Sequence, residues 1–213
     1  MVKSERLQKL MKKVKVWVKL ILNWRFLVCF GIAWMITNGW SYVLFGIGVL
    51  TTAAKAELAS EEGVAFAYKM MTTLNKSARD AMVKYNVHAC TDVTGFGLLG
   101  HTYEMAQGSD VEITLNVDAI DLIPEALEFA RIGILPAGMY RNRTFAEPGV
   151  DAGDIELAKQ DLLYDPQTAG GLLMAVAPED ADALFEELKA CVPSAQRIGF
   201  VSEYTGGKRI TLR

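Results

Sequence analysis

Cysteine and histidine are scarce in this chain of 213 residues. The three cysteines, Cys29, Cys90 and Cys191, lie far apart, and none belongs to a Cys-x-x-Cys pair. This pattern argues against a disulfide framework and against a zinc site, and it suits a reducing compartment. The sequence also lacks a P-loop and any Ser-His-Asp or Cys-His arrangement, so the common signatures of phosphate-loop proteins and of nucleophile-based hydrolases are missing.

Acidic residues are nearly absent from the first 25 positions, where eight Lys and Arg residues face Glu5 alone. The rest of the chain carries 14 basic and 24 acidic residues, and this acidic balance argues against a nucleic-acid surface. Within residues 1–25 the apolar positions fall on one helical face with lysines between them: Leu7, Leu10, Met11, Val14 and Val18. We therefore predict a basic amphipathic helix over residues 1–25.

Charged residues of either sign are absent from Phe26 to Ala54, a run of 29 positions. Because a bilayer core needs about 20 apolar residues, we predict a long apolar helix over residues 26–45 that spans a membrane or inserts into it. Trp34 and Trp40 are of the residue type that gathers at membrane interfaces. The chain would then be membrane-associated through residues 26–45, with residues 46–213 in the cytoplasm.

Two alternatives remain open for this apolar segment. A secretory signal fits the small-x-small sequence at residues 54–56, although Asn38 and Gly39 interrupt the apolar run. The segment could instead be a helix that covers the exposed face of a sheet.

Because basic residues before a span tend to stay in the cytoplasm, a single full span would place residues 46–213 outside the cell. A helix in the membrane interface, or a chimeric or truncated reading frame, would avoid that conflict.

Short apolar runs and helix-like segments alternate from residue 49 onward. Strands are predicted at Val49–Thr52, Val87–Thr91, Val111–Asn116, Leu172–Val176, Gln196–Val201 and Ile210–Leu212. Helices are predicted at Glu61–Thr73, Ser77–Tyr85, Leu98–Ala106, Pro124–Ile132 and from Pro178 to about Ala190, with a loop-rich stretch at Leu135–Asp154. Strands interleaved with helices indicate an α+β fold, a mixed β-sheet with packed helices, over residues 46–213.

The segment ACTDVTGFGLLGH at residues 89–101 is the most informative motif of the chain. Asp92 lies between Thr91 and Thr94, after an apolar run of strand length and before a helix-like run. Three glycines follow, at Gly95, Gly97 and Gly100. A carboxylate beside a Gly-rich turn at a helix start could hold a phosphate or a metal–nucleotide, because glycine admits close backbone approach and helix N-termini favour anions.

The same glycines permit two other interpretations. Their spacing matches the G-x-G-x-x-G dinucleotide fingerprint, but the longer series of strand–helix units that a dinucleotide fold needs is missing. They also fit a tight strand–helix turn in which glycine serves geometry alone. Asp92 would then be a helix N-cap, a role that Asp often fills before such a turn.

Five segments, in the same order, resemble the C-terminal half of selenide, water dikinase (selenophosphate synthetase). They are GVLTTAAKAEL at 48–58, MMTTLNKSARDAM at 70–82, ACTDVTGFGLLGH at 89–101, GMYRNR at 138–143 and LYDPQTAGG at 163–171. The resemblance covers residues 46–213 and implies a domain like the C-terminal domain of aminoimidazole ribonucleotide synthetase. Residues 1–45 do not resemble the family, whose N-terminal domain carries the reactive Cys or selenocysteine, an essential Lys and several metal-binding Asp residues.

The resemblance implies a nucleotide site with Mg²⁺ and ATP, in which Asp92 binds the metal. Thr91, Thr94 and Gly95 would contact phosphate. A second Gly-rich turn would supply Thr168, Gly170 and Gly171, although Ala169 stands where the family usually has Ser. The motifs contain two further polar residues of interest. We expect Asn142 on a loop, and for His101 we find no acidic partner.

The intact family converts ATP, selenide and water into selenophosphate, AMP and phosphate. No catalytic residue is assigned here, because one retained carboxylate cannot assemble that chemistry. We therefore expect a dikinase-like chain that is inactive alone, with ATP and selenide as the family's ligands and a homodimer as a further expectation. The alternative is a membrane-associated protein that uses the domain to bind a nucleotide or a partner without catalysis.

Overall fold

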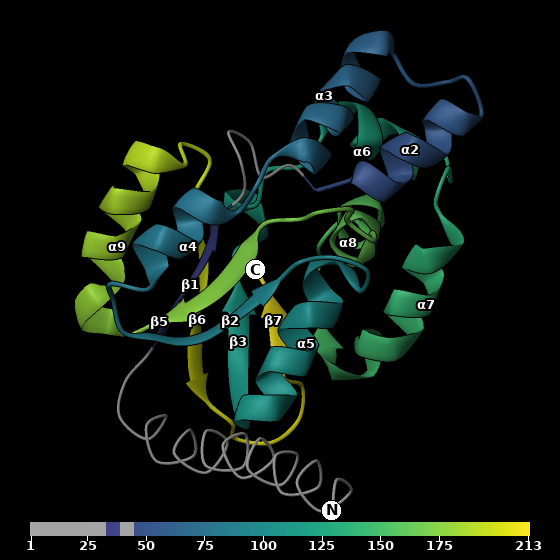
Figure 1. Ribbon diagram of the computed structural model, residues 1–213. Helices are drawn as coiled ribbons and strands as arrows, with labels where there is room; N and C mark the ends of the chain where they lie inside the picture. Colours follow the sequence, from purple (N-terminus) through teal and green to yellow (C-terminus); the bar gives the residue numbers. More distant parts are fainter. Residues whose placement is uncertain (1–32, 39–44) are drawn as a thin grey trace, which may run out of the picture. The chain divides into compact units, whose positions relative to one another are not determined.

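The computed structural model describes residues 33–38 and 45–213, and for residues 33–38 it describes the backbone. Strands of this part form one mixed sheet (Figure 1). In sheet order they are β2 (Val87–Asp92), β5 (Leu172–Val176), β1 (Ala33–Asn38), β6 (Gln196–Glu203), β3 (Val111–Leu115), β7 (Ile210–Leu212) and β4 (Val150–Asp151). Neighbours from β2 to β3 pair antiparallel, whereas β7 pairs with both β3 and β4 in parallel. The predicted α+β fold with a mixed sheet is confirmed.

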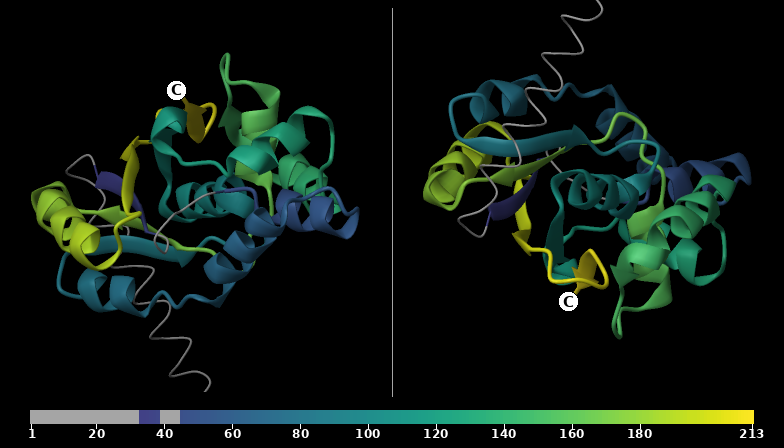
Figure 2. Two further views of the ribbon diagram at one scale, coloured as in Figure 1. Left: turned by 90° about the horizontal axis from the view of Figure 1, so that it is seen from above. Right: turned by 90° about the horizontal axis from the view of Figure 1, so that it is seen from below.

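Helices pack on both faces of this sheet and in a cluster beside it. Their bounds are α2 (Ile47–Lys55), α3 (Glu61–Thr72), α4 (Lys76–Met82), α5 (Gly97–Ser109), α6 (Pro124–Arg131), α7 (Ala137–Ala146), α8 (Leu157–Tyr164) and α9 (Pro178–Cys191), with short 3₁₀ turns at Val117–Ala119 and Glu147–Gly149. Helices α4 and α9 lie on one face of β2 and β5, and α5 lies on the other (Figure 2).

Two clusters of buried hydrophobic side chains among the described residues hold these layers together. In the first, Met174 and Val176 of β5 are buried against Ala81 of α4 and Leu184 and Leu188 of α9. These strand residues are two apart and therefore share a face of the sheet. In the second core, α2, α3, α6 and α8 pack together beside the sheet, around the fully buried residues Val49, Leu50, Ala126 and Leu162.

The strand predicted at Val49–Thr52 is wrong, because these residues belong to helix α2. The β-branched, apolar run favours a strand locally, but tertiary contacts decide otherwise. The N-terminus of α2 receives partners from a distant part of the chain: the Gly48 N–H donates to Asp165 Oδ2 at 2.7 Å and the Ile47 N–H to Gln167 Oε1 at 3.4 Å. These acceptors satisfy amides that a helix start leaves without intrahelical partners.

The apolar helix predicted over residues 26–45 is wrong for residues 33–38. That stretch forms strand β1, which pairs antiparallel with β5 on one side and with β6 on the other. Both edges of β1 are therefore paired, so this stretch lies inside the sheet. The rest of the predicted segment, and the basic helix over residues 1–25, lie outside the described residues. Among the described helices, none has the length and apolar character needed to cross a bilayer.

The loop-rich interpretation of Leu135–Asp154 is also wrong in part, because Ala137–Ala146 forms helix α7. Pro136 is its N-cap residue, and the Met139 N–H donates to the Pro136 carbonyl at 3.0 Å. The other predicted elements are present with shifts of a few residues at their ends, including helix α9, which begins at Pro178 as predicted.

The position of β1 predicts that proline at Thr37 disrupts the sheet. Thr37 lies opposite Leu173 of β5 and Gln196 of β6. Proline has no N–H to donate, so Thr37→Pro should lower the free energy of unfolding by at least about 1 to 3 kcal/mol, the cost of an unpaired backbone group. Urea unfolding followed by circular dichroism measures this change. Thr37→Val keeps the N–H and is the control, and equal stability of the two variants would contradict the strand assignment.

Candidate functional site

Asp92 is the last residue of β2 and lies opposite Leu172, the first residue of β5. Its side chain is exposed, and among the described residues no hydrogen bond or ion pair engages its carboxylate. The N-cap interpretation of Asp92 is wrong: helix α5 begins at Gly97, its N-cap position is Phe96, and no side chain caps it there. The Asp92 carboxylate is therefore available to a ligand at the mouth of the β2–α5 turn.

The two Gly-rich turns predicted to act together lie side by side. The Val93 N–H donates to the Gly171 carbonyl at 2.8 Å, and the Gln167 N–H donates to the Thr94 carbonyl at 2.9 Å. The Thr94 carbonyl also accepts from the Gly97 N–H at 3.1 Å, which closes the turn into α5. These backbone bonds bring residues 92–95 against residues 167–171.

Glycine is required at two of these positions for geometry. A Cβ on Gly170 would overlap the Val93 carbonyl oxygen. Gly97 has a φ of +69°, and a Cβ there would come within 2.7 Å of the Tyr164 carbonyl oxygen. Gly95 differs from both, since no atom lies within 4 Å of a Cβ built on it. At Gly170 and Gly97 the absence of a side chain lets two segments of the chain pack closely together. At Gly95 it leaves open space beside the turn.

The threonines of the candidate site have different surroundings. Thr91 Oγ1 donates to the Asp92 carbonyl at 3.2 Å, and because neighbouring strand residues face opposite sides, Thr91 does not share a face with the Asp92 side chain. Thr94 Oγ1 lies 3.5 Å from Nε2 of His101. Thr168 is exposed on the second turn. The structure thus gathers Asp92, Thr94 and Thr168 around the paired turns and turns Thr91 away.

Asn142 supports the site from beneath. The loop expected for it is wrong, since Asn142 lies on helix α7 and is buried. Its Nδ2 donates to the carbonyl of Gly95 and to the carbonyl of Tyr164, both at 2.9 Å. One amide thereby joins the first Gly-rich turn to the end of α8. On the other side, Asn75 Nδ2 donates to the Gly170 carbonyl at 2.9 Å and anchors the second turn.

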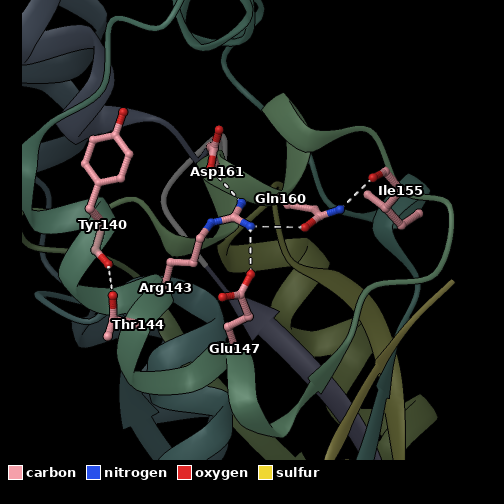
Figure 3. A network of polar contacts seen from close by, with 7 residues as sticks. All are labelled: Tyr140, Arg143, Thr144, Glu147, Ile155, Gln160 and Asp161. Carbon is pink, nitrogen blue, oxygen red and sulfur yellow. Dashed lines mark hydrogen bonds and ion pairs between the residues drawn. The ribbon is translucent and has the colours of Figure 1, made fainter.

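Next to Asn142, Arg143 ties α7 to α8 through a polar network (Figure 3). Its guanidinium makes an ion pair with the buried Asp161 at 2.6 Å and a second, with Glu147, at 3.2 Å. It also stacks on the ring of Tyr164, with 4.8 Å between the guanidinium carbon and the ring centroid. The burial of Tyr164 raises the pKa of its hydroxyl to about 12, so this side chain stays neutral at physiological pH. The network holds α7 against α8, and thereby holds Asn142 in position on α7.

Asp165 is the buried acid that sequence reasoning missed. Its side chain is fully buried, and Oδ2 accepts from the Gly48 N–H at 2.7 Å and from Gln167 Nε2 at 3.1 Å, while Oδ1 has no partner among the described residues. Burial raises the pKa of Asp165 to about 7, against the opposing effect of the amides of Val49 and Gly48 and of Gln167. Asp165 lies inside the motif LYDPQTAGG, and this position is the sequence signal that could have identified it.

The described residues offer a bound metal few protein ligands. No group of three or more His, Cys, Asp or Glu residues is placed to hold an ion within residues 45–213. This donor set fits Mg²⁺ bound together with a nucleotide, because Mg²⁺ is commonly held by one or two carboxylates and by the phosphates of its substrate.

The dinucleotide interpretation is wrong, since β2 is an edge strand that pairs antiparallel with β5, whereas that fold needs a parallel sheet.

Comparison with known families settles the ancestry of the chain. The profile of the AIR synthase related protein C-terminal domain matches residues 39–211. The chain belongs to this family. It is also homologous to selenide, water dikinases, with 48% identity over 143 residues to the protein of Treponema denticola and 41% over 169 residues to that of Clostridium botulinum.

These matches cover 67% and 79% of this chain but 40% and 49% of the two relatives. The chain thus spans about half the length of the curated relatives it matches, and the resemblance to the C-terminal part of selenide, water dikinase is confirmed. Solved structures support the fold. The hydrogenase maturation protein HypE of E. coli superposes with a TM-score of 0.59 at 16% identity over 87% of this chain and 47% of its own. The tt0281 protein of Thermus thermophilus gives 0.56 at 19%, over 85% and 49%.

The geometry predicts different effects for alanine at one glycine of each paired turn. Gly170→Ala should lower the free energy of unfolding by about 1 to 3 kcal/mol, because its methyl group must displace the Val93 carbonyl. Gly95→Ala is the matched control and should change stability by less than about 0.5 kcal/mol, because its methyl group meets open space. Urea unfolding of both variants measures the difference. A neutral Gly170→Ala would contradict the close contact between the turns.

Asp165 should make the stability of the protein depend on pH. Its pKa is raised in the folded state, to about 7 from 3.8, so the folded protein binds this proton more tightly than the unfolded chain. Its contribution to stability is complete below about pH 4 and is lost as pH rises through 7. Asp165→Asn has no such proton and keeps an oxygen acceptor for Gly48. Between pH 4 and 7 the unfolding free energy of the wild type should therefore fall relative to that of Asp165→Asn. Urea unfolding of both proteins across this pH range measures the change. A difference independent of pH would contradict the raised pKa.

Proposed function

We propose that residues 46–213 bind the phosphates of a magnesium–nucleotide at the paired turns after β2 and before β5, with Asp92 as the metal-binding carboxylate. The reaction served is of the selenide, water dikinase type, in which ATP, selenide and water become selenophosphate, AMP and phosphate. The observation that carries this proposal is the exposed Asp92 carboxylate, without a protein partner among the described residues, beside two Gly-rich turns joined by backbone hydrogen bonds.

The residues of the chain have separate roles in this proposal. Asp92 offers carboxylate oxygens, the ligand type that Mg²⁺ prefers. Gly95 leaves space in which a phosphate can approach the backbone, and Thr94 and Thr168, on the two paired turns, would offer hydroxyls to it. Thr91, Gly170 and Gly171 act indirectly, by shaping the strand end and the second turn. The bound Mg²⁺ would supply neutralisation of phosphate charge.

Preorganisation of the turns strengthens the proposal. The amides of Asn142 and Asn75 hold the carbonyls of Gly95 and Gly170, one in each turn, at 2.9 Å. A site whose backbone is already ordered loses less conformational entropy when a ligand binds. Both asparagines therefore favour a ligand site at these turns over a surface loop without function.

The comparisons point the same way. The relatives that share 41–48% identity with this chain are named selenide, water dikinase. A HypE structure with the same fold was solved in complex with ATP, at a TM-score of 0.51 and 18% identity. Because the chain matches about half of each relative, we propose that the dikinase reaction needs groups beyond those of residues 46–213, and that this domain alone binds the nucleotide without turning it over.

The proposal predicts that Asp92→Asn weakens the binding of magnesium-ATP by roughly tenfold or more, the scale on which metal sites respond to loss of a supporting group. Asp154→Asn is the matched control, because Asp154 is also exposed and has no partner among the described residues. Isothermal titration of the full chain with magnesium-ATP measures both affinities. Equal affinity of the two variants would overturn the role of Asp92.

Turnover is tested separately by phosphorus NMR of the full chain with magnesium-ATP and selenide under anaerobic reduction. We expect no selenophosphate and no AMP above the level of Asp92→Asn. Product formed by the wild type alone would mean that this chain carries the whole reaction, contrary to the proposal that it only binds the nucleotide.

A further inference from the structure

His101 is a nearly buried histidine in the second turn of α5, beside the candidate nucleotide site. Its side chain is 11% exposed. Nδ1 lies 3.2 Å from Oε2 of Glu104, three residues further along the same helix. On the other side of the ring, Nε2 accepts from the backbone N–H of Phe96 at 3.4 Å. The expectation that His101 has no acidic partner is therefore wrong.

These two contacts independently define the same tautomer of the ring. A backbone N–H can only donate, so the Nε2 that faces Phe96 must be unprotonated. A carboxylate can only accept, so the Nδ1 that faces Glu104 must carry the proton. Both requirements are met by the neutral ring with its hydrogen on Nδ1, and the acid at Glu104 selects that form.

The Phe96 N–H belongs to the turn that joins β2 to α5. Phe96 is the N-cap position of this helix, where amide groups lack intrahelical partners and where no side chain of the preceding turn supplies a cap. His101 reaches back from within the helix to accept this hydrogen bond. Its ring also packs on the ring of Phe96, with 5.4 Å between centroids. The imidazole thus fixes the turn next to Thr94 and Gly95 from the helix side.

A role as general base for Thr94 is not supported by this geometry. Thr94 Oγ1 is 3.5 Å from Nε2, the outer limit for a hydrogen bond and longer than the distance expected between a nucleophile and its base. The Nε2 lone pair is also engaged by the Phe96 N–H. The order Thr–His–Glu resembles a catalytic triad, but the contacts are those of a structural clamp on the turn.

We propose that His101 is a positioning residue for the nucleotide turn, and that Glu104 acts through it by holding the proton on Nδ1. The proposal rests on the proposed function, since the turn it positions is the one assigned to the phosphates. Thr94, Gly95 and the neighbouring Asp92 would then keep their ligand-binding arrangement only while Nε2 accepts from Phe96.

The tautomer is directly measurable because the chain contains only two histidines. The full chain is labelled with ¹⁵N-histidine and its ring nitrogens are recorded at pH ~8, above the usual titration range of imidazole. His101→Gln identifies the His101 signals by their loss. We expect a protonated Nδ1 and an unprotonated Nε2. Glu104→Gln, which still accepts from Nδ1, should keep this form, whereas Glu104→Ala should move the population toward Nε2–H. An Nε2–H ring in the wild type, or no change in Glu104→Ala, would overturn the proposal.

The effect on the site is measured with the same full chain and magnesium-ATP. His101→Leu removes the acceptor and should weaken binding about fivefold, the scale of one hydrogen bond, and should speed hydrogen exchange at the Phe96 amide. His101→Gln offers a side-chain oxygen in place of Nε2 and should restore both, and Gln107→Leu on the same helix is the control. Unchanged affinity and exchange in His101→Leu would overturn the positioning role.

The two proposals fail in different ways. If the wild type does not bind magnesium-ATP, the proposed function fails and the ligand role of the turn fails with it. The ring tautomer and the exchange of the Phe96 amide need no ligand, so they decide whether His101 and Glu104 hold the turn in either case.

Discussion

The buried carboxylate of Asp165 is the contact on which the arrangement of the site depends. It accepts a hydrogen bond from Gly48, 117 residues earlier, and so holds the start of α2 at the end of α8. The segment that follows Asp165 then meets the turn after β2 through the Gln167 and Gly171 backbone. Burying this group without full pairing is unfavourable, which is why its pKa rises to about 7. Strongly shifted pKa values cluster at functional sites, and Asp165 lies next to the candidate site.

All five segments that resemble the dikinase meet around this short stretch. Asn75 and Asn142 come from two of them and reach the two turns with their side-chain amides, while Gly48 and the β2–α5 turn supply backbone groups. The motifs therefore coincide in space as well as in order along the chain. The side chains of Asn75, Asn142 and Asp165 hold backbone groups in position, whereas the Asp92 carboxylate faces solvent without a partner among the described residues.

Prediction from sequence succeeded where the signal was local. Pro178 at the start of α9, the apolar alternation of Val111–Leu115 and the strand before Asp92 all appear as predicted. It failed where a distant partner decided the conformation. Val49 lies in a β-branched run that forms a helix because its N-terminus is capped from 117 residues away. Residues 33–38 form a strand because β5 and β6 offer edges on both sides, and a charge-free run has no periodicity that distinguishes that state from a buried helix.

By itself the sequence determined the fold class, the family and the residues to examine, because these depend on short-range periodicity and on the order of motifs. The tertiary structure alone decided which of those residues meet. It showed that Asn142 is a buried bridge on a helix, and that Asp165 is a structural acid under the site. It also paired His101 with Glu104, a partner three positions away that only helix geometry brings to the ring. The physical reason is that hydrogen-bond partners are chosen by distance in space, and distance in space is set only when the sheet and the helices have packed.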